Sequence, residues 1–300
     1  SVGMGQDLYK TFDLVKKVFK EADEKLNYPI SNLILNGPED QLQLTQNTQP
    51  SILTVSFSIF KVLKDEFDFD FNTFNYFAGH SLGEYSALVC SESLKFEDAI
   101  YLLYERGKAM QEAVPVGKGS MLAILGTKIT DIYDLLNSFK EKGVCEIAND
   151  NADGQVIVSG DKDSIDSFQS LLKEKKIKSI PLKVSAPFHC SLMKSAADKM
   201  SDKIENIKFG KPTHSILSNV TAKIEKNPEN IKKLLIDQIF STVKWRETII
   251  NISNEGVSNF VEIGPGKVLT GMVKRTIKNA NCFSINSVDD IKNLKNEFKK

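Results

Sequence analysis

Apolar residues recur every three or four positions in the first part of the chain, which is the spacing of one buried helix face. Over residues 7–26 this face consists of Leu8, Phe12, Val15, Phe19, Ala22 and Leu26. The spacing returns after Pro50, a residue suited to the first position of a helix, and again over residues 96–113. We therefore predict a helix over 7–26, one that begins at Pro50, and one over 96–113.

Residues 119–184 follow a pattern of their own. Strand patterns cover residues 120–125, 144–148, 155–159 and 177–184, and helix patterns cover residues 129–142 and 163–175. The Asn, Asp and Gly residues within 149–154 indicate a turn between the second and third strands. The order βαββαβ is that of the ferredoxin-like motif. This predicts a small inserted subdomain over 117–185, with a larger subdomain formed by 1–116 and 186–300.

Strands and helices also alternate in the larger subdomain. Strand patterns cover residues 74–78, 216–220, 257–263 and 282–286, and helix patterns lie near residues 229–241, 245–255 and 267–279. Such alternation is typical of a mostly parallel sheet covered by helices on both faces. The predicted fold class is therefore α/β, with a mostly parallel sheet subdomain and an inserted ferredoxin-like subdomain.

Composition narrows the functional classes. The 300 residues are 41% hydrophobic and 26% charged, as in an ordinary globular enzyme. Because 39 basic residues balance 39 acidic ones, net charge gives no support for nucleic-acid binding. No apolar run reaches the length that spans a bilayer, so no membrane partner is expected. The four cysteines have no metal-binding spacing, and we expect reduced thiols and no metal site.

A serine motif stands between a predicted strand and a predicted helix. The segment Gly79-His80-Ser81-Leu82-Gly83 fits the nucleophile elbow, in which a tight turn exposes the serine hydroxyl. Side chains two residues either side of Ser81 would collide, so glycine suits both positions. The N–H of Leu82, at the start of the helix, can donate to an oxyanion. The alternative interpretation is a chance match of this short pattern in a turn.

A serine nucleophile needs a base, and the chain has three histidines. His80 neighbours Ser81 and should project away from its hydroxyl, which suggests a structural role. His214 directly precedes a predicted strand, where a surface or capping role is expected. His189 lies in a loop before a helix and is the best base candidate by elimination. No acidic residue flanks His189, so the sequence leaves the group that orients it unidentified.

Six segments in the same order give the chain a family resemblance. They span residues 48–50, 79–90, 106–115, 155–160, 187–193 and 262–271. With these segments the chain resembles the malonyl-CoA:acyl-carrier-protein transacylases, an acyltransferase family of fatty acid synthesis. The resemblance implies a hydrolase-like α/β subdomain with a ferredoxin-like insert. It implies malonyl transfer from malonyl-CoA to the phosphopantetheine thiol of acyl carrier protein, through an acyl-serine and without a metal or redox cofactor.

The resemblance also assigns roles to residues. It implies Ser81 as nucleophile, His189 as base, and Gln238 as the group whose backbone carbonyl orients the imidazole. Arg106, which by itself could be a surface residue with a buried stem, would grip the malonyl carboxylate. A guanidinium suits this role because it can pair with both carboxylate oxygens at once.

The resemblance further implies what shapes the acyl pocket and what is missing. Met110 and Phe188 would narrow the pocket, and Phe188 should disfavour a branched substrate such as methylmalonyl. In the family, a Gly-Gln-Gly-x-Gln loop that supplies a second oxyanion N–H precedes the segment that matches Val2-Gly3-Met4, and the sequence lacks it. We expect a soluble protein of a plastid-type organelle or a bacterial cytoplasm.

Two other functions fit parts of the pattern. A hydrolase, such as an esterase or thioesterase, would carry the same elbow but would have less use for Arg106. A non-catalytic module that docks a carrier protein is disfavoured by Ser81 and His189 together. The absence of the family's first strand, which precedes that loop, keeps this second alternative open.

Overall fold

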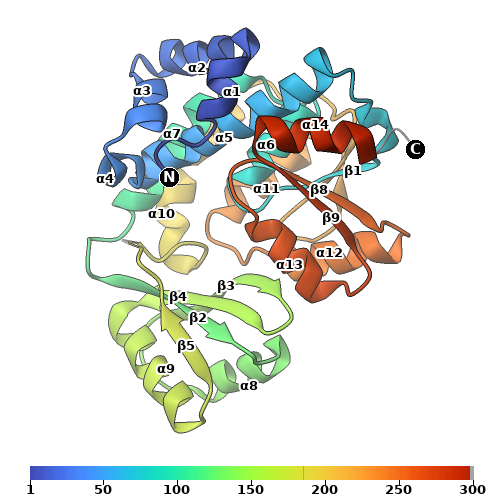
Figure 1. Cartoon of the computed structure of the whole chain (residues 1–300). Helices are drawn as coiled ribbons and strands as arrows, with labels where there is room; N and C mark the ends of the chain where they lie inside the picture. The colour runs from blue at the N-terminus through green and yellow to red at the C-terminus, as the bar shows by residue number, and fades with distance from the viewer. Residues whose placement is uncertain (185, 298–300) are drawn as a thin grey trace.

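Helices of the N-terminal third pack side by side around one long central helix, α5 (Figure 1). The computed structural model describes residues 1–184 and 186–297. The helices of this third are α1 (Gln6–Thr11), α2 (Asp13–Leu26), α3 (Ile30–Asn36), α4 (Glu39–Leu42), α5 (Thr45–Lys61), α6 (Gly83–Cys90) and α7 (Phe96–Glu112). A π-helical turn, η1 (Val62–Glu66), and a 3-10 turn, η2 (Phe71–Thr73), lead from α5 to the first strand.

Two of the predicted helices differ in detail from the sequence expectation. The predicted helix 7–26 is interrupted at Phe12, whose backbone is extended and whose ring packs against Phe67. The helix predicted to begin at Pro50 instead begins at Thr45, so Pro50 lies inside α5. A proline there removes one helical hydrogen bond, and the buried packing of α5 outweighs this loss.

The larger subdomain contains two short sheets in place of one mostly parallel sheet. The first has the order β1-β6-β7, formed by β1 (Tyr76–Phe77), β6 (Ser215–Leu217) and β7 (Ile224–Glu225). The second pairs β8 (Asn259–Ile263) with β9 (Asn281–Ile285). The pairings β1–β6 and β8–β9 are parallel, as predicted, and β6–β7 is antiparallel.

The predicted strand 216–220 ends early for a local reason. After Leu217 the chain turns back in a hairpin, in which Ser218 donates its N–H to Lys223 and accepts from the N–H of Ala222. Asn219 is thereby released from the sheet and buried against the loop that follows β1. The remaining helices of this subdomain are η3 (Ser191–Met193, a 3-10 turn), α10 (Lys194–Glu205), α11 (Pro228–Gln238), α12 (Trp245–Asn254), α13 (Val268–Thr276) and α14 (Val288–Glu297).

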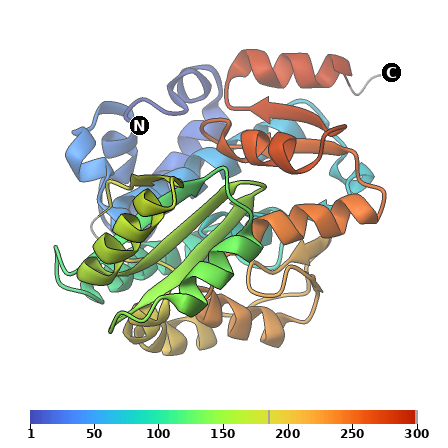
Figure 2. The ribbon, with the colours of Figure 1, turned by 90° about the horizontal axis from the view of Figure 1, so that it is seen from below.

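The small subdomain has the predicted βαββαβ order. Its elements are β2 (Gly119–Leu125), α8 (Ile129–Ser138), β3 (Cys145–Ala152), β4 (Gln155–Asp161), α9 (Lys162–Glu174) and β5 (Lys178–Pro181). The strands form one antiparallel sheet in the order β3-β4-β2-β5, and α8 and α9 lie on one face of it (Figure 2). The α/β fold class with an antiparallel insert is thus confirmed. The exact division at residues 117–185 stays a prediction, and its boundary residue 185 lies, with 298–300, outside the described residues.

The turn predicted at 149–154 is wrong for its first residues, because β3 continues to Ala152. The side chains of Asn149, Asp150 and Asn151 are buried, and Asp150 donates its backbone N–H to Val243 of the larger subdomain at 3.0 Å. Val243 in turn donates to Ala148 at 2.8 Å, and Arg246 pairs with the Asp150 carboxylate at 2.9 Å. The polar end of β3 is therefore hydrogen-bonded to the larger subdomain. The alternation of apolar and polar residues along the chain does not predict such a contact.

All four cysteines are free, and burial raises the pKa of each thiol. Within residues 1–184 and 186–297, none of the helices combines the length and apolar character required to cross a bilayer.

Candidate active site

Ser81 lies in a tight turn between β1 and α6. Its backbone has φ 54°, in the left-handed region that non-glycine residues seldom occupy. The turn is closed by hydrogen bonds from Gly83 to His80 at 2.9 Å and from Glu84 to Ser81 at 3.1 Å. Such a strained turn at the end of a strand is the geometry of a nucleophile elbow.

The two glycines that flank Ser81 are not equivalent. A Cβ on Gly79 would lie 1.8 Å from the carbonyl oxygen of Gly83, so a side chain there is excluded. A Cβ on Gly83 would meet nothing within 4 Å. The expectation that collisions require glycine on both sides is therefore wrong for Gly83, because its side chain position points to open space at the start of α6.

His189 lies beside the serine hydroxyl. Its Nε2 is 2.8 Å from Ser81 Oγ, and its Nδ1 is 2.9 Å from the backbone oxygen of Gln238. Because a carbonyl only accepts, Nδ1 carries the proton and Nε2 is free to accept one from the serine. Burial, reinforced by the charge of Arg106, lowers the pKa of His189 to about 3. The imidazole is therefore neutral at ordinary pH, as a general base must be.

Arg106 projects from α7 into the same site and is almost fully buried. One Nη donates to Gln49 Oε1 at 2.6 Å. The other donates to Gln238 Oε1 at 2.7 Å and to Ser81 Oγ at 3.0 Å. Among the described residues no carboxylate lies within ion-pair distance of this guanidinium, and its Nε has no partner. A buried cation without a paired anion next to a serine hydroxyl is suited to an acyl group that carries its own negative charge.

The oxyanion and pocket residues are placed as follows. Leu82 is the N-cap residue of α6, and its N–H has no acceptor among the described residues. Met110 follows Arg106 by one helical turn on α7 and is buried, with Sδ 3.8 Å from Gln49 Nε2. Phe188 directly precedes His189 and packs against the main core. The effects of these side chains on the acyl group stay predictions.

Three polar residues that received no role from the sequence complete the site. Gln49 accepts from Arg106, as described above. Asn219 accepts from the Ser81 N–H at 2.7 Å and donates to Gly79 at 2.8 Å, which secures the elbow from both ends. Glu84 accepts from the Asn219 N–H at 2.7 Å and from Gln238 Nε2 at 3.1 Å. Glu84 and Gln49 lie in segments 79–90 and 48–50, which carry the family resemblance and could have indicated a role. Asn219 lies in none of these segments.

Glu84 is a buried carboxyl, with 3% of its surface exposed. Burial raises its pKa to about 8, and the hydrogen bond from Asn219 and the charge of Arg106 oppose this rise. A carboxyl with a strongly raised pKa beside a nucleophile is typical of a functional site.

The other two histidines lie away from the serine hydroxyl. His80 Nε2 is 2.7 Å from Asn151 Oδ1 at the end of β3. His214 stacks on Phe77 at 4.0 Å and bonds to the backbone oxygen of Phe71. Both arrangements fit the structural roles expected of these residues.

The hairpin β3–β4 supports both halves of the serine–histidine pair. Its Asn151 holds His80, the neighbour of Ser81. Its Ser159 donates to the backbone oxygen of Phe188, the neighbour of His189, at 2.6 Å. The small subdomain thus contacts the residues next to the nucleophile and next to the base.

No cluster of three or more His, Cys, Asp or Glu side chains that could hold a metal ion occurs in the described part of the chain. The described residues of the site offer a substrate a serine hydroxyl, an imidazole, a guanidinium and backbone N–H groups.

Comparisons with known proteins agree with this arrangement. Residues 2–298 match the family model described as the acyl transferase domain. The chain is 41% identical over 289 residues to the malonyl CoA-acyl carrier protein transacylase of Haemophilus influenzae, covering 96% of this chain and 92% of that protein. It is similar to the crystal structure of an acyl-carrier-protein S-malonyltransferase from Bartonella henselae, with a TM-score of 0.96 and 36% identity over 100% of this chain and 96% of that one. A malonyl-transacylase solved in complex with a holo type II PKS acyl-carrier protein matches with a TM-score of 0.93 and 37% identity, over 99% and 96% of the two chains.

Proposed function

This chain belongs to the acyl transferase domain family, and on that premise we propose that it transfers a malonyl group from malonyl-CoA to the phosphopantetheine thiol of acyl carrier protein, for fatty acid biosynthesis. The enzyme class is that of the [acyl-carrier-protein] S-malonyltransferases. The observation that carries the proposal is the buried guanidinium of Arg106, whose Nη lies 3.0 Å from Ser81 Oγ.

In the first half-reaction Ser81 attacks the thioester carbonyl of malonyl-CoA. His189 Nε2, 2.8 Å from Oγ, takes the hydroxyl proton as the C–O bond forms. The Gln238 carbonyl at Nδ1 stabilises the imidazolium that results. The tetrahedral intermediate places its oxyanion at the N–H of Leu82, and it collapses when coenzyme A leaves and takes the proton from His189.

In the second half-reaction the carrier's thiol attacks the malonyl-serine ester. His189 accepts the thiol proton and returns it to Ser81 Oγ when the ester bond breaks. Through both halves Arg106 holds the malonyl carboxylate, a charged acceptor that takes the place of the Ser81 hydroxyl at the guanidinium. The bond changes balance without an external oxidant or reductant.

Intact mass spectrometry after mixing with malonyl-CoA tests the first half. We expect a malonyl-sized adduct on the native chain and none on Ser81→Ala. Addition of holo carrier protein should then remove the adduct and add the same mass to the carrier, whereas the apo carrier, which lacks the thiol, should leave the adduct in place.

The alternatives give different results in the same tube. A hydrolase would release free coenzyme A and malonate without loading the carrier. A non-catalytic docking module would bind the carrier and form no adduct. The compartment, a plastid-type organelle or the bacterial cytoplasm, stays a prediction that the bacterial relatives leave open.

A further inference from the structure

The buried Arg106 is linked to a buried carboxyl through one amide side chain. Arg106 Nη2 donates to Gln238 Oε1 at 2.7 Å, and Gln238 Nε2 donates to Glu84 Oε2 at 3.1 Å. All three residues are at most 3% exposed. The amide of Gln238 therefore lies between Arg106 and Glu84, with its oxygen toward Arg106 and its nitrogen toward Glu84.

The amide can serve Arg106 in only one orientation. A guanidinium has donors and no acceptor, so it requires the oxygen of Gln238. The nitrogen of Gln238 must then find acceptors, and it has three within reach, namely Glu84 Oε2, Ser81 O at 3.1 Å and Asn219 Oδ1 at 3.2 Å. Of these groups Glu84 is the one whose side chain could change from acceptor to donor by a single isosteric substitution.

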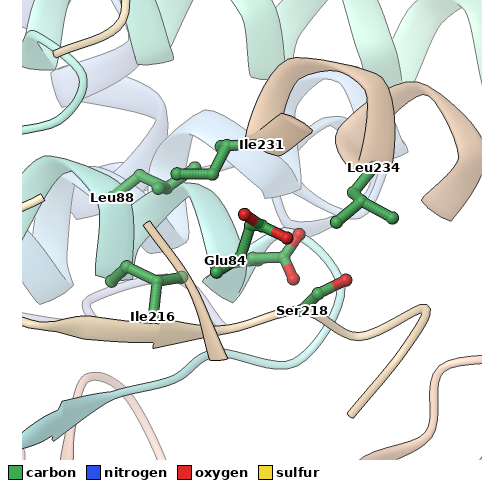
Figure 3. Close-up of a pocket in the computed structure, with 7 residues that line it drawn as sticks. Glu84, Leu88, Ile216, Ser218, Ile231 and Leu234 are labelled. Carbon is green, nitrogen blue, oxygen red and sulfur yellow. The ribbon is translucent and has the colours of Figure 1, made fainter. Parts of the chain in front are cut away.

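Glu84 has little else to interact with. Its other oxygen accepts the Asn219 N–H at 2.7 Å. Figure 3 shows the remaining side of the carboxyl at a small pocket, with Leu88, Ile216, Ile231 and Leu234 around it and Ser218 nearby. This cavity, of about 10 Å³, has room for roughly one water molecule. The carboxyl is therefore committed to its two protein donors and is not solvated by bulk water.

We propose that Glu84 is a positioning residue that fixes the amide orientation of Gln238 and thereby holds the Arg106 guanidinium ready for the substrate carboxylate. This inference rests on the proposed function, because it assigns Glu84 to the recognition of a negatively charged acyl group. Both carboxyl oxygens keep lone pairs to accept with, whether or not the group carries a proton. An amide in the same place offers one oxygen and one NH₂ group.

The substitution Glu84→Gln tests this orientation. If the new oxygen accepts from Asn219, the new NH₂ faces the nitrogen of Gln238, and a rotated Gln238 would in turn present its nitrogen to Arg106. The opposite orientation of the new amide turns its NH₂ to the Asn219 N–H, so each arrangement sets two donors against each other in the network that holds Gln238. Acetyl-CoA has no carboxylate and does not need this contact, so we expect the ratio of kcat/KM for malonyl-CoA to that for acetyl-CoA to fall about tenfold in Glu84→Gln.

Three other variants make the test specific. Glu84→Asp keeps two acceptor oxygens and should retain more of the malonyl preference than Glu84→Gln. Glu225→Gln removes the other carboxyl at the same cavity, one that does not contact Gln238, and should leave the ratio unchanged. Should Glu84→Gln not fold, Gln238→Met removes the amide but keeps the backbone carbonyl that His189 needs, and it should lower the same ratio.

The outcomes separate this inference from the proposed function. A ratio that is unchanged in Glu84→Gln and in Gln238→Met, or equal losses with both substrates, would overturn the role of Glu84 while native malonyl transfer stands. Absence of a malonyl adduct on native Ser81 would overturn both.

Discussion

The guanidinium of Arg106 and the hydroxyl of Ser81 lie 3.0 Å apart, so the cation and the nucleophile meet at one point inside the protein. A malonyl ester on Ser81 carries its carboxylate only two bonds beyond the ester carbonyl. Arg106 is therefore close enough to pair with the carboxylate and still border the reacting carbonyl. Because Arg106 and Ser81 are different groups, we expect acyl selection and acyl transfer to be separable by mutation.

Replacement of Arg106 should change acyl preference more than it changes chemistry. We expect Arg106→Ala to lower kcat/KM for malonyl-CoA about 100-fold relative to acetyl-CoA, since a charge-assisted pair is lost. Arg106→Lys should retain only part of the preference for malonyl-CoA, because an ammonium group cannot pair with both carboxylate oxygens. Steady-state kinetics with both thioesters measures the ratio, and equal losses with both would show that Arg106 does not bind the carboxylate.

His189 should still act as a base at pH values well below 6.5, where a free imidazole becomes protonated. Its pKa of about 3 keeps it neutral from pH 7 to pH 5, so the rate of Ser81 acylation should not fall near pH 6.5. Because the folded-state pKa lies below the unfolded one, the stability that the neutral form contributes is lost as the pH falls from 6.5 toward 3. Rapid-quench acylation between pH 5 and pH 7 provides the measurement, and a titration near 6.5 would contradict the buried neutral base.

A matched pair of histidine variants supports the same assignment. His189→Ala should slow acylation about 1000-fold, the usual order for loss of a general base. His214→Ala, at a half-buried residue that stacks on Phe77 away from Ser81, should leave the acylation rate within about twofold of native.

The protonation of Glu84 should affect stability in the opposite direction from that of His189. Its folded-state pKa of about 8 lies above the unfolded value, so the folded chain holds a proton that the unfolded chain has lost. Stability is therefore lost as the pH rises from about 4.5 to about 8. The groups that face this carboxyl are Arg106 from α7, Tyr85 from α6 and Glu225 from β7.

Denaturant unfolding at pH 6 and pH 8.5 measures this effect. The native protein should lose about 1 to 3 kcal/mol more than Glu84→Gln between the two pH values. Glu225→Gln serves as the control for loss of a carboxyl at the same cavity. Parallel losses in all three proteins would mean that Glu84 does not titrate in this range.

The two glycines of the elbow should tolerate alanine very differently. Gly79→Ala places a methyl group 1.8 Å from a backbone oxygen, so the elbow must shift, and we expect loss of acylation together with several kcal/mol of stability. Gly83→Ala enters open space at the first residue of α6, where alanine is a better helix former, and should change stability by about 1 kcal/mol or less. Thermal melts and acylation of the two variants give the comparison. A Gly83→Ala variant as damaged as Gly79→Ala would contradict the elbow geometry.

Asn219→Ala should impair the elbow and leave acyl preference unchanged, because Glu84 and the Ser81 carbonyl still accept from Gln238 Nε2. The side chain accepts from the Ser81 N–H and donates to Gly79, and its loss leaves both groups buried and unpaired. We expect destabilisation of about 1 to 3 kcal/mol and equal losses of kcat/KM with malonyl-CoA and acetyl-CoA. This pattern would distinguish Asn219 from Arg106, whose loss should be selective.

The sequence predicted the elements whose signals are local or repeated. The helical spacing, the βαββαβ order and the elbow between a strand and a helix all depend on neighbours along the chain, and each was found. Pro50 was misjudged because the packing of α5 extends the helix five residues before it, against the local preference of proline. The strand that ends at Leu217 was overestimated because Asn219 leaves the sheet for a contact with Gly79, which is distant in sequence.

The same distinction holds for the site. Ser81 and His189 could be named because the first has a motif and the second is one of three histidines. Glu84 and Asn219 act through contacts 135 residues apart along the chain, and nothing in either local sequence indicates the other. Polar networks of this kind are assembled by the fold. Their members can be predicted from the sequence only where they lie in segments that match a known family.

The hairpin β3–β4 limits how this enzyme can be divided. Asn151 and Ser159 of that hairpin secure the residues next to Ser81 and next to His189, and Asp150 pairs with Arg246 across the boundary. The insert is therefore not a transplantable module. A chimera that exchanges the small subdomain must join the chain at two points and must also preserve these side-chain contacts between the subdomains. Without them the distance between the nucleophile and the base will change, although neither residue has been altered.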